Sequence, residues 1–148
     1  MTRIVVASDH AAFEAKAALA AHLRAAGHEV LDVGTDGPAS VDYPDFGAKG
    51  ARAVAEGRGE RGVFLCGSGI GICIAANKVR GIRAAQVYDE SSAEMSRRHN
   101  DANVACLGAR TMPVERLLAL VDLFLATPFE GGRHAGRVRK LGELESSG

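Results

Sequence analysis

A short glycine-rich segment, Cys66-Gly67-Ser68-Gly69-Ile70-Gly71, places a thiol and a hydroxyl beside backbone N–H groups that glycine leaves accessible. The apolar run at residues 62–66 predicts a buried strand before it, and residues 70–77 predict a helix after it. Free N–H groups at the start of a helix bind anions. The sequence therefore predicts an anion site at this strand-to-helix turn, with Cys66 and Ser68 at its mouth.

Established glycine motifs do not fit this segment. A dinucleotide fingerprint requires glycine where the chain has Ile72, and a Walker loop requires a lysine that is absent. A cysteine-dependent phosphatase requires arginine six positions after its nucleophile, where this chain has Ile72. A G-x-S-x-G nucleophile elbow centred on Ser68 requires glycine at the positions of Cys66 and Ile70. What remains is an oxyanion cradle with a thiol, which is suited to holding an enediolate while a base moves a proton.

Further reactive side chains follow the predicted strands. Asp9 and His10 follow the first strand, Cys66 ends the third and Arg110 follows the fifth. Ligands of open parallel sheets bind outside the carboxyl ends of the strands, so these groups should meet at one edge. A helix cap or a surface pair also explains Asp9 and His10, and core packing also explains Cys66. Their coincidence at one edge favours the functional interpretation.

Three more candidates lie on predicted helices. His99 ends a helix, where the helix dipole favours the imidazolium and hence a role as an acid; a solvated histidine is the alternative. Arg133 and Arg137 are four residues apart on one helix face. They could hold a phosphate through paired hydrogen bonds, or form a solvated face.

The remaining cysteines are predicted to be core residues. Cys73 shares a helix face with Ile70 and Ile74, and Cys106 lies within a predicted strand. The cysteines and histidines show no spacing typical of metal ligands, so no metal is expected.

The composition of the 148-residue chain argues against a charged macromolecule as its partner. Its 18 basic and 18 acidic residues give no overall field that would attract nucleic acid or a membrane. Three cysteines without paired spacing, and no signal-like or long apolar segment, predict reduced thiols and a cytoplasmic protein. We expect one domain over residues 1–148.

Strands and helices alternate along the chain. The predicted strands cover residues 3–8, 28–33, 62–66, 82–87 and 103–107. The predicted helices cover about 12–26, 46–57, 70–77, 91–100 and 113–125. This alternation predicts a three-layer α/β/α sandwich around a five-stranded parallel, Rossmann-like sheet. An extra C-terminal helix at about 133–144 feeds no further strand, so we expect it to contact the site or a partner subunit.

Two helices carry more detailed predictions. The segment from Ser91 to Glu94 matches a capping box, which predicts the start of the fourth helix. The buried face of the fifth helix is predicted from the spacing of Val114, Leu117, Leu118, Val121 and Leu125.

Six blocks of the sequence together resemble the ribose-5-phosphate isomerase B family, relatives of the galactose-6-phosphate isomerase subunits. The resemblance implies interconversion of ribose 5-phosphate and ribulose 5-phosphate in the pentose phosphate pathway, without a metal or other cofactor. It also implies homodimers or tetramers in which two subunits share each active site. The blocks are Ser8-Asp9-His10-Ala11, Asp42-Tyr43-Pro44, the glycine-rich segment, Ala75-Ala76-Asn77-Lys78, His99-Asn100-Asp101-Ala102-Asn103-Val104 and Glu130-Gly131-Gly132-Arg133-His134.

Carried over by position, the resemblance implies a role for each candidate. Cys66 would be the base that moves the proton between C1 and C2, with the backbone from Gly67 to Gly71 around the enediolate oxygens. Ser68 would move protons between those oxygens, and His99, assisted by Asp9, would open the sugar ring. Further contacts with the substrate are implied for His10, Tyr43, Asn100, Arg110, Arg133, His134 and Arg137.

Two positions place the chain within the family. Many members have threonine at Ser68, which keeps the hydroxyl, and one branch uses a glutamate base where this chain has Ile72. The thiol of Cys66 therefore indicates the cysteine-base branch. Two alternatives remain at this point: an isomerase of a six-carbon aldose phosphate such as allose or galactose 6-phosphate, or a non-catalytic module that binds sugar phosphates.

Overall fold

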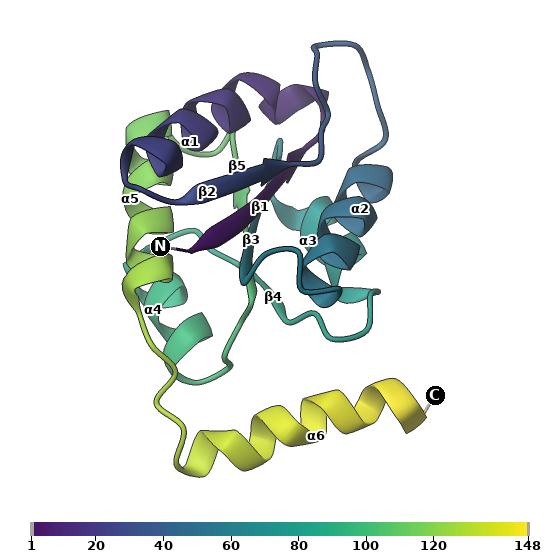
Figure 1. Cartoon of the computed structure of the whole chain (residues 1–148), viewed down its shortest axis with the longest axis vertical. Coiled ribbons are helices and arrows are strands. Elements are labelled where there is room, and N and C mark those ends of the chain that lie inside the picture. Colours follow the sequence, from purple (N-terminus) through teal and green to yellow (C-terminus); the bar gives the residue numbers. More distant parts are fainter. Residues whose placement is uncertain (1, 148) are drawn as a thin grey trace.

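In the computed structural model, which describes residues 2–147, five parallel strands form one sheet (Figure 1). The strands are β1 (Arg3–Ser8), β2 (Glu29–Asp32), β3 (Arg61–Cys66), β4 (Ala84–Gln86) and β5 (Val104–Gly108). Their order across the sheet is β2-β1-β3-β5-β4, and every neighbouring pair is parallel. The predicted parallel sheet is therefore confirmed.

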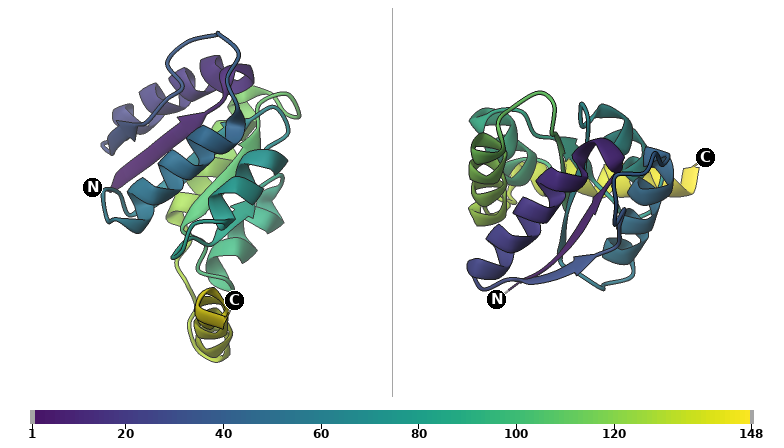
Figure 2. Two further views of the ribbon diagram at one scale, coloured as in Figure 1. Left: turned by 90° about the vertical axis from the view of Figure 1, so that its right-hand side faces the viewer. Right: turned by 90° about the horizontal axis from the view of Figure 1, so that it is seen from above.

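Helices cover both faces of this sheet, as Figure 2 shows. They are α1 (Phe13–Ala25), α2 (Tyr43–Ala55), α3 (Ile70–Asn77), α4 (Glu90–Arg98), α5 (Val114–Ala126) and α6 (Arg133–Ser147), and a 3-10 turn, η1 (His10–Ala12), precedes α1. Side chains of α1, α4 and α5 form one apolar core with the sheet, and those of α2 and α3 form a second core on the other face. These two cores confirm the three-layer α/β/α sandwich.

The start of α4 differs from the prediction. Asp89, rather than Ser91, is the N-cap: its carboxylate accepts a hydrogen bond of 2.7 Å from the N–H of Ser92. The Ser92 hydroxyl in turn accepts from the N–H of Asp89 at 3.1 Å. The reciprocal pair thus uses an aspartate and a serine in place of the serine and glutamate of the predicted capping box.

Two helix faces also differ from their predictions. In α5, Leu117 and Val121 are buried as predicted, but Leu120 and Phe124 complete the buried face while Val114 lies at the exposed start of the helix. In α3, the side of the helix toward the sheet carries Ile72 and Ala76, so Ile70 and Ile74 are exposed and Cys73 is only partly buried. Cys106 is fully buried, as predicted.

The last helix, α6, runs across one end of the layered body and is set apart from it (Figures 1 and 2). One anchor is a hydrogen bond of 2.8 Å from the N–H of Gly81 to the Glu145 carboxylate. A groove of about 990 Å³ lies between α6 and the segment 77–85, and Leu141 and Leu144 are exposed beside it. No helix within residues 2–147 has the length and apolar character that crossing a membrane requires.

Candidate active site

A cleft of about 650 Å³ opens at the carboxyl ends of β1, β3 and β5, and we call it the cysteine cleft. It brings together Asp9, Cys66 and Arg110, which the sequence predicted to meet at this edge. The groove beside α6 is larger, but the cysteine cleft holds the thiol and the glycine turn. Its lining consists of Asp9, Tyr43, Cys66, Gly67, Ser68, Ile70, Gly71, Ile74, Arg110 and Thr111.

The glycine turn points its amides at the reactive atoms of this cleft. The N–H of Gly69 donates to Cys66 Sγ at 3.1 Å, and the N–H of Ile70 donates to Ser68 Oγ at 3.2 Å. Gly69 has a φ of +81°, and a Cβ there would lie 2.7 Å from the backbone carbon of Leu107. Only glycine fits this position. A hydrogen bond to sulfur favours the thiolate, which is the nucleophilic and basic form of cysteine.

Asp9 and His10 follow β1 and are held by backbone amides. Asp9 Oδ1 accepts from the N–H of Ala12 at 3.2 Å, so this buried carboxylate caps η1 and also lines the cleft. The cap interpretation of Asp9 is therefore confirmed, and its role in the reaction stays a prediction. His10 Nδ1 accepts from the N–H of Val41 at 3.1 Å. A neutral imidazole with Nδ1 as acceptor carries its hydrogen on Nε2, so His10 offers one ring donor.

Two larger side chains lie against glycines of the cleft. A Cβ on Gly67 would lie 3.5 Å from Arg110 Nη1, so the guanidinium lies over the turn. A Cβ on Gly71 would lie 2.5 Å from the ring of Tyr43, which starts α2 and is partly exposed. Glycine at position 71 therefore lets the phenol approach the turn, whereas a Cβ at position 67 would make an ordinary contact with Arg110.

A second group of candidates lies around His99, and we call His99, Glu130, Arg133, His134 and Arg137 the histidine end. The rings of His99 and His134 are stacked, with centroids 4.2 Å apart and planes 13° apart. Glu130 Oε1 lies 3.7 Å from Nε2 of the buried His134. Burial lowers the pKa of His134, and the charges of His99 and Arg133 lower it further. Both effects favour the neutral form of His134.

The histidine end also contains a set of potential metal ligands that the sequence spacing did not indicate. Within residues 2–147, the ligand atoms of His99, Glu130 and His134 lie within 4.8 Å of one another. A metal lies in the plane of each imidazole that binds it, whereas these two planes are nearly parallel and stacked. One ring would have to turn before both could bind the same ion.

The histidine end lies at the opposite edge of the sheet from the cysteine cleft. Helices α4 and α5 run back against the direction of the strands, so His99 after α4 and Arg133 after α5 lie near the amino ends of the strands. Asn100 lies with them and lines the groove beside α6. One chain therefore does not assemble all the predicted site residues around Cys66.

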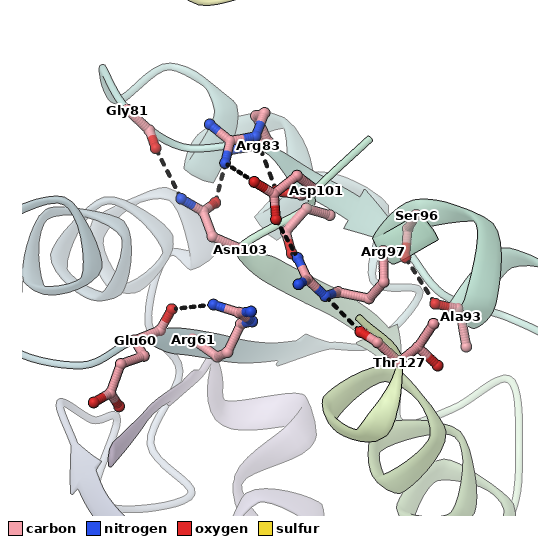
Figure 3. A network of polar contacts seen from close by, with 11 residues as sticks. Glu60, Arg61, Gly81, Arg83, Ala93, Ser96, Arg97, Asp101, Asn103 and Thr127 are labelled. Atoms are coloured by element: carbon pink, nitrogen blue, oxygen red, sulfur yellow. Dashed lines mark hydrogen bonds and ion pairs between the residues drawn. The ribbon is translucent and has the colours of Figure 1, made fainter. Parts of the chain in front are cut away.

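The buried Arg97 connects the segments next to the histidine end, and Figure 3 shows its polar contacts. Arg97 donates to the Thr127 carbonyl at 3.1 Å, to the Ala102 carbonyl at 2.7 Å and to Asp101 Oδ1 at 2.8 Å. The N–H of Glu130 donates to the carbonyl of Arg98 at 3.0 Å. These bonds tie the segment after α4 to the segment after α5, and so bring His99 and His134 into contact.

Three residues of the cleft region were missed from the sequence. Thr111 and Ile74 line the cleft, and Gln86 Nε2 donates to the carbonyl of Ser68 at 3.1 Å. Gln86 had a recognisable signal, because it is a polar residue near the carboxyl end of a predicted strand, the end at which ligands bind. Thr111 and Ile74 had none beyond their nearness in sequence to Arg110 and Ile70.

Comparisons with known proteins identify a family for the whole chain. A family model described as Ribose/Galactose Isomerase matches residues 4–141. Ribose-5-phosphate isomerase B of Escherichia coli strain K12 is 42% identical over 145 residues, which cover 98% of this chain and 97% of the relative. A D-erythrulose-4-phosphate isomerase of Pectobacterium atrosepticum is 41% identical over 147 residues, which cover 98% of this chain and 96% of the relative.

A solved structure extends the likeness to three dimensions. The structure of Clostridium thermocellum ribose-5-phosphate isomerase B superposes with a TM-score of 0.96 at 50% identity and covers 98% of both chains. These matches confirm the resemblance seen in the six sequence blocks. The chain belongs to the ribose/galactose isomerase family.

Proposed function

We propose that this protein is a ribose-5-phosphate isomerase that interconverts D-ribose 5-phosphate and D-ribulose 5-phosphate. The observation that carries this proposal is the hydrogen bond of 3.1 Å from the Gly69 N–H to the sulfur of Cys66, in a cleft at the carboxyl edge of the sheet. Relatives and a solved structure named ribose-5-phosphate isomerase B support the choice of sugar. We assign this activity to one domain, residues 1–148, acting in the cytoplasm in the pentose phosphate pathway.

In the proposed reaction, Cys66 acts on the open-chain sugar. Its thiolate takes the proton from C2, the C1 carbonyl becomes an enediolate oxygen, and the thiol then returns the proton to C1. The amides from Gly67 to Gly71 stabilise the negative charge on the enediolate oxygens. The Ser68 hydroxyl carries the proton from the C2 hydroxyl to the C1 oxygen, which completes the aldose-to-ketose conversion.

The histidine end supplies the other half of the proposed site from a second copy of the chain. In this homodimer, His99 of one subunit protonates the ring oxygen of the sugar held in the other, assisted by Asp9. Arg133 and Arg137 bind the phosphate with Arg110 and His10, and Asn100, Tyr43 and His134 contact the sugar phosphate. The opposite locations of the two groups support this sharing, because neither end alone carries both Cys66 and His99.

Exposed apolar side chains around both ends support the homodimer. Tyr43, Ile70 and Ile74 are exposed at the cleft, and Leu141 and Leu144 are exposed on α6. Large apolar side chains exposed at two sites favour association with another protein surface. A second copy seated there would cover this surface and bring its histidine end to the cleft.

The substitution Cys66→Ala tests the proposal. We expect it to abolish isomerisation while leaving the affinity for ribose 5-phosphate nearly intact, measured by turnover and by calorimetry. Appreciable residual turnover would remove Cys66 from its assigned role.

One relative is named D-erythrulose-4-phosphate isomerase, so erythrulose 4-phosphate is a second candidate substrate for the same reaction. A panel of ribose 5-phosphate, allose 6-phosphate and erythrulose 4-phosphate compares kcat/KM across four to six carbons. The proposal requires ribose 5-phosphate to give the highest value.

A further inference from the structure

Gln86 reaches the glycine turn from the far side of a neighbouring strand. It is the last residue of β4, and it pairs in register with Cys106 of β5, while the turn follows β3 on the other side of β5. Its side-chain amide nevertheless donates to the carbonyl of Ser68 at 3.1 Å. The strand between them ends in Gly108, where a Cβ would lie 2.6 Å from the Ser68 oxygen. Glycine at 108 therefore leaves the space in which this carbonyl lies.

The peptide group that Gln86 holds is the same group that contacts Cys66. The carbonyl of Ser68 and the N–H of Gly69 belong to one planar peptide unit, in which they point in opposite directions. The carbonyl accepts from Gln86, and the N–H donates to Cys66 Sγ at 3.1 Å. The hydrogen bond at one end of the plane therefore fixes the direction of the hydrogen bond at the other end.

This peptide unit needs such an anchor because of the residue that follows it. Gly69 has a φ of +81°, and glycine populates positive and negative φ with similar ease. Turns that differ in the sign of φ at this position differ by a flip of the preceding peptide unit. A flip of the 68–69 peptide would turn its carbonyl oxygen toward the sulfur, and this oxygen would repel a thiolate.

We propose that Gln86 is a positioning residue for the base: by holding the Ser68 carbonyl, it keeps the Gly69 N–H on the sulfur of Cys66 and so favours the reactive thiolate. This proposal rests on the proposed function of Cys66 as the base. Gln86 acts through the peptide unit and has no contact of its own with the thiol.

The substitution Gln86→Met tests this role, because methionine has a similar length and no N–H donor. Alkylation of Cys66 by iodoacetamide is followed against pH, and peptide mass spectrometry separates it from alkylation of Cys73 and Cys106. We expect the midpoint of this curve to rise by about one pH unit and kcat to fall about tenfold, as the loss of one hydrogen bond to a charged group predicts. KM should change by less than about twofold, since the substrate contacts remain.

Two further variants distinguish the positioning role of Gln86 from a general destabilisation of β4. Asn77→Leu removes another side-chain amide bound to β4, which donates to the Ala84 carbonyl at 2.9 Å and accepts from the Ala84 N–H at 2.8 Å. It should lower the melting temperature without moving the Cys66 midpoint. Gln86→Lys keeps a donor at similar reach, and its midpoint should lie at or below that of the unsubstituted protein.

Each outcome supports or overturns the proposal. An unchanged midpoint in Gln86→Met overturns it, as does an equal rise in Asn77→Leu or in Gln86→Lys. The alkylation curve does not depend on turnover. The protein could fail to isomerise ribose 5-phosphate while the midpoint of Cys66 alkylation still rose in Gln86→Met. That result would contradict the proposed function and support the positioning role of Gln86.

Discussion

The cysteine cleft and the histidine end differ in how the chain builds them. The reactive groups of the cleft lie close in sequence, because the thiol, the hydroxyl and the amides belong to one turn between β3 and α3, although other parts of its lining come from distant segments. At the histidine end, the stacked rings of His99 and His134 come from residues 35 positions apart in the sequence. The buried Arg97 stabilises this contact through hydrogen bonds to the Thr127 and Ala102 carbonyls. The difference shows that the chain builds the two regions, at opposite ends of its strands, in different ways: one from a single turn and the other from hydrogen bonds between distant segments.

Mixing two inactive variants gives the largest expected effect and tests whether the halves belong to different chains. Cys66→Ala and His99→Ala should each be inactive alone. When they are co-expressed, half of the dimers should be mixed, and each mixed dimer should carry one intact site, giving about a quarter of the unsubstituted activity. Isomerase turnover per chain is the measurement. If the mixture stayed inactive, the two halves would not be complementary.

The substitution Arg97→Leu should damage the histidine end alone. It leaves the Thr127 and Ala102 carbonyls and the Asp101 carboxylate without their buried donor, and should lower the free energy of unfolding by about 3–5 kcal/mol in urea titrations. The Cys66 alkylation curve of the folded variant should be unchanged. Arg98→Leu is the matched control. It breaks an exposed ion pair with Glu94, and should cost less than about 1 kcal/mol.

Acid should weaken the histidine end through His134. Burial lowers the pKa of this side chain below its ordinary value of 6.5, so the unfolded chain takes up the proton first as the pH falls. The contribution of His134 to stability is therefore complete above pH 6.5 and declines below it. His134→Gln should flatten this decline when urea midpoints are compared at about pH 7.5 and 5.5. Parallel curves for the two proteins would contradict this assignment.

The smallest expected effect concerns the hydroxyl of the cysteine cleft. Ser68→Thr keeps an oxygen that accepts from the Ile70 N–H, so kcat for ribose 5-phosphate should stay within about threefold. Ser68→Ala removes that oxygen and should lower kcat about tenfold or more. Equal values for the alanine and threonine variants would exclude the hydroxyl from proton transfer.

The fold was largely predictable because local patterns determine its elements. The bounds of β1 and α3 match their predictions, since a β-branched run and a glycine turn give clear signals. The helix α2 begins earlier than predicted, at Tyr43, because Pro44 fits its first turn. Lys16 could not be predicted as a buried residue. Its Nζ lies 2.6 Å from Asp32, a partner that only the fold brings near.

The predicted site likewise contains groups that the sequence could place and groups that it could not. The thiol, the hydroxyl and the amides of the turn could be placed from the sequence, because neighbouring residues build them. The stacking of His99 on His134 could not, because it depends on the length of α5 and on the bonds of Arg97. The role of Gln86 was also hidden, since it depends on the order of β3, β5 and β4 in the sheet.

The position of the Ser68 carbonyl against Gly108 links the chemistry to strand register. The backbone of one loop occupies the space that a side chain would take on the neighbouring strand. If β5 slipped by one residue, Leu107 or Ala109 would lie under that carbonyl and displace the turn. We therefore expect turnover only from molecules in which β5 has paired in this register. Turnover per chain then reports the fraction of molecules in a preparation that have the correct strand register.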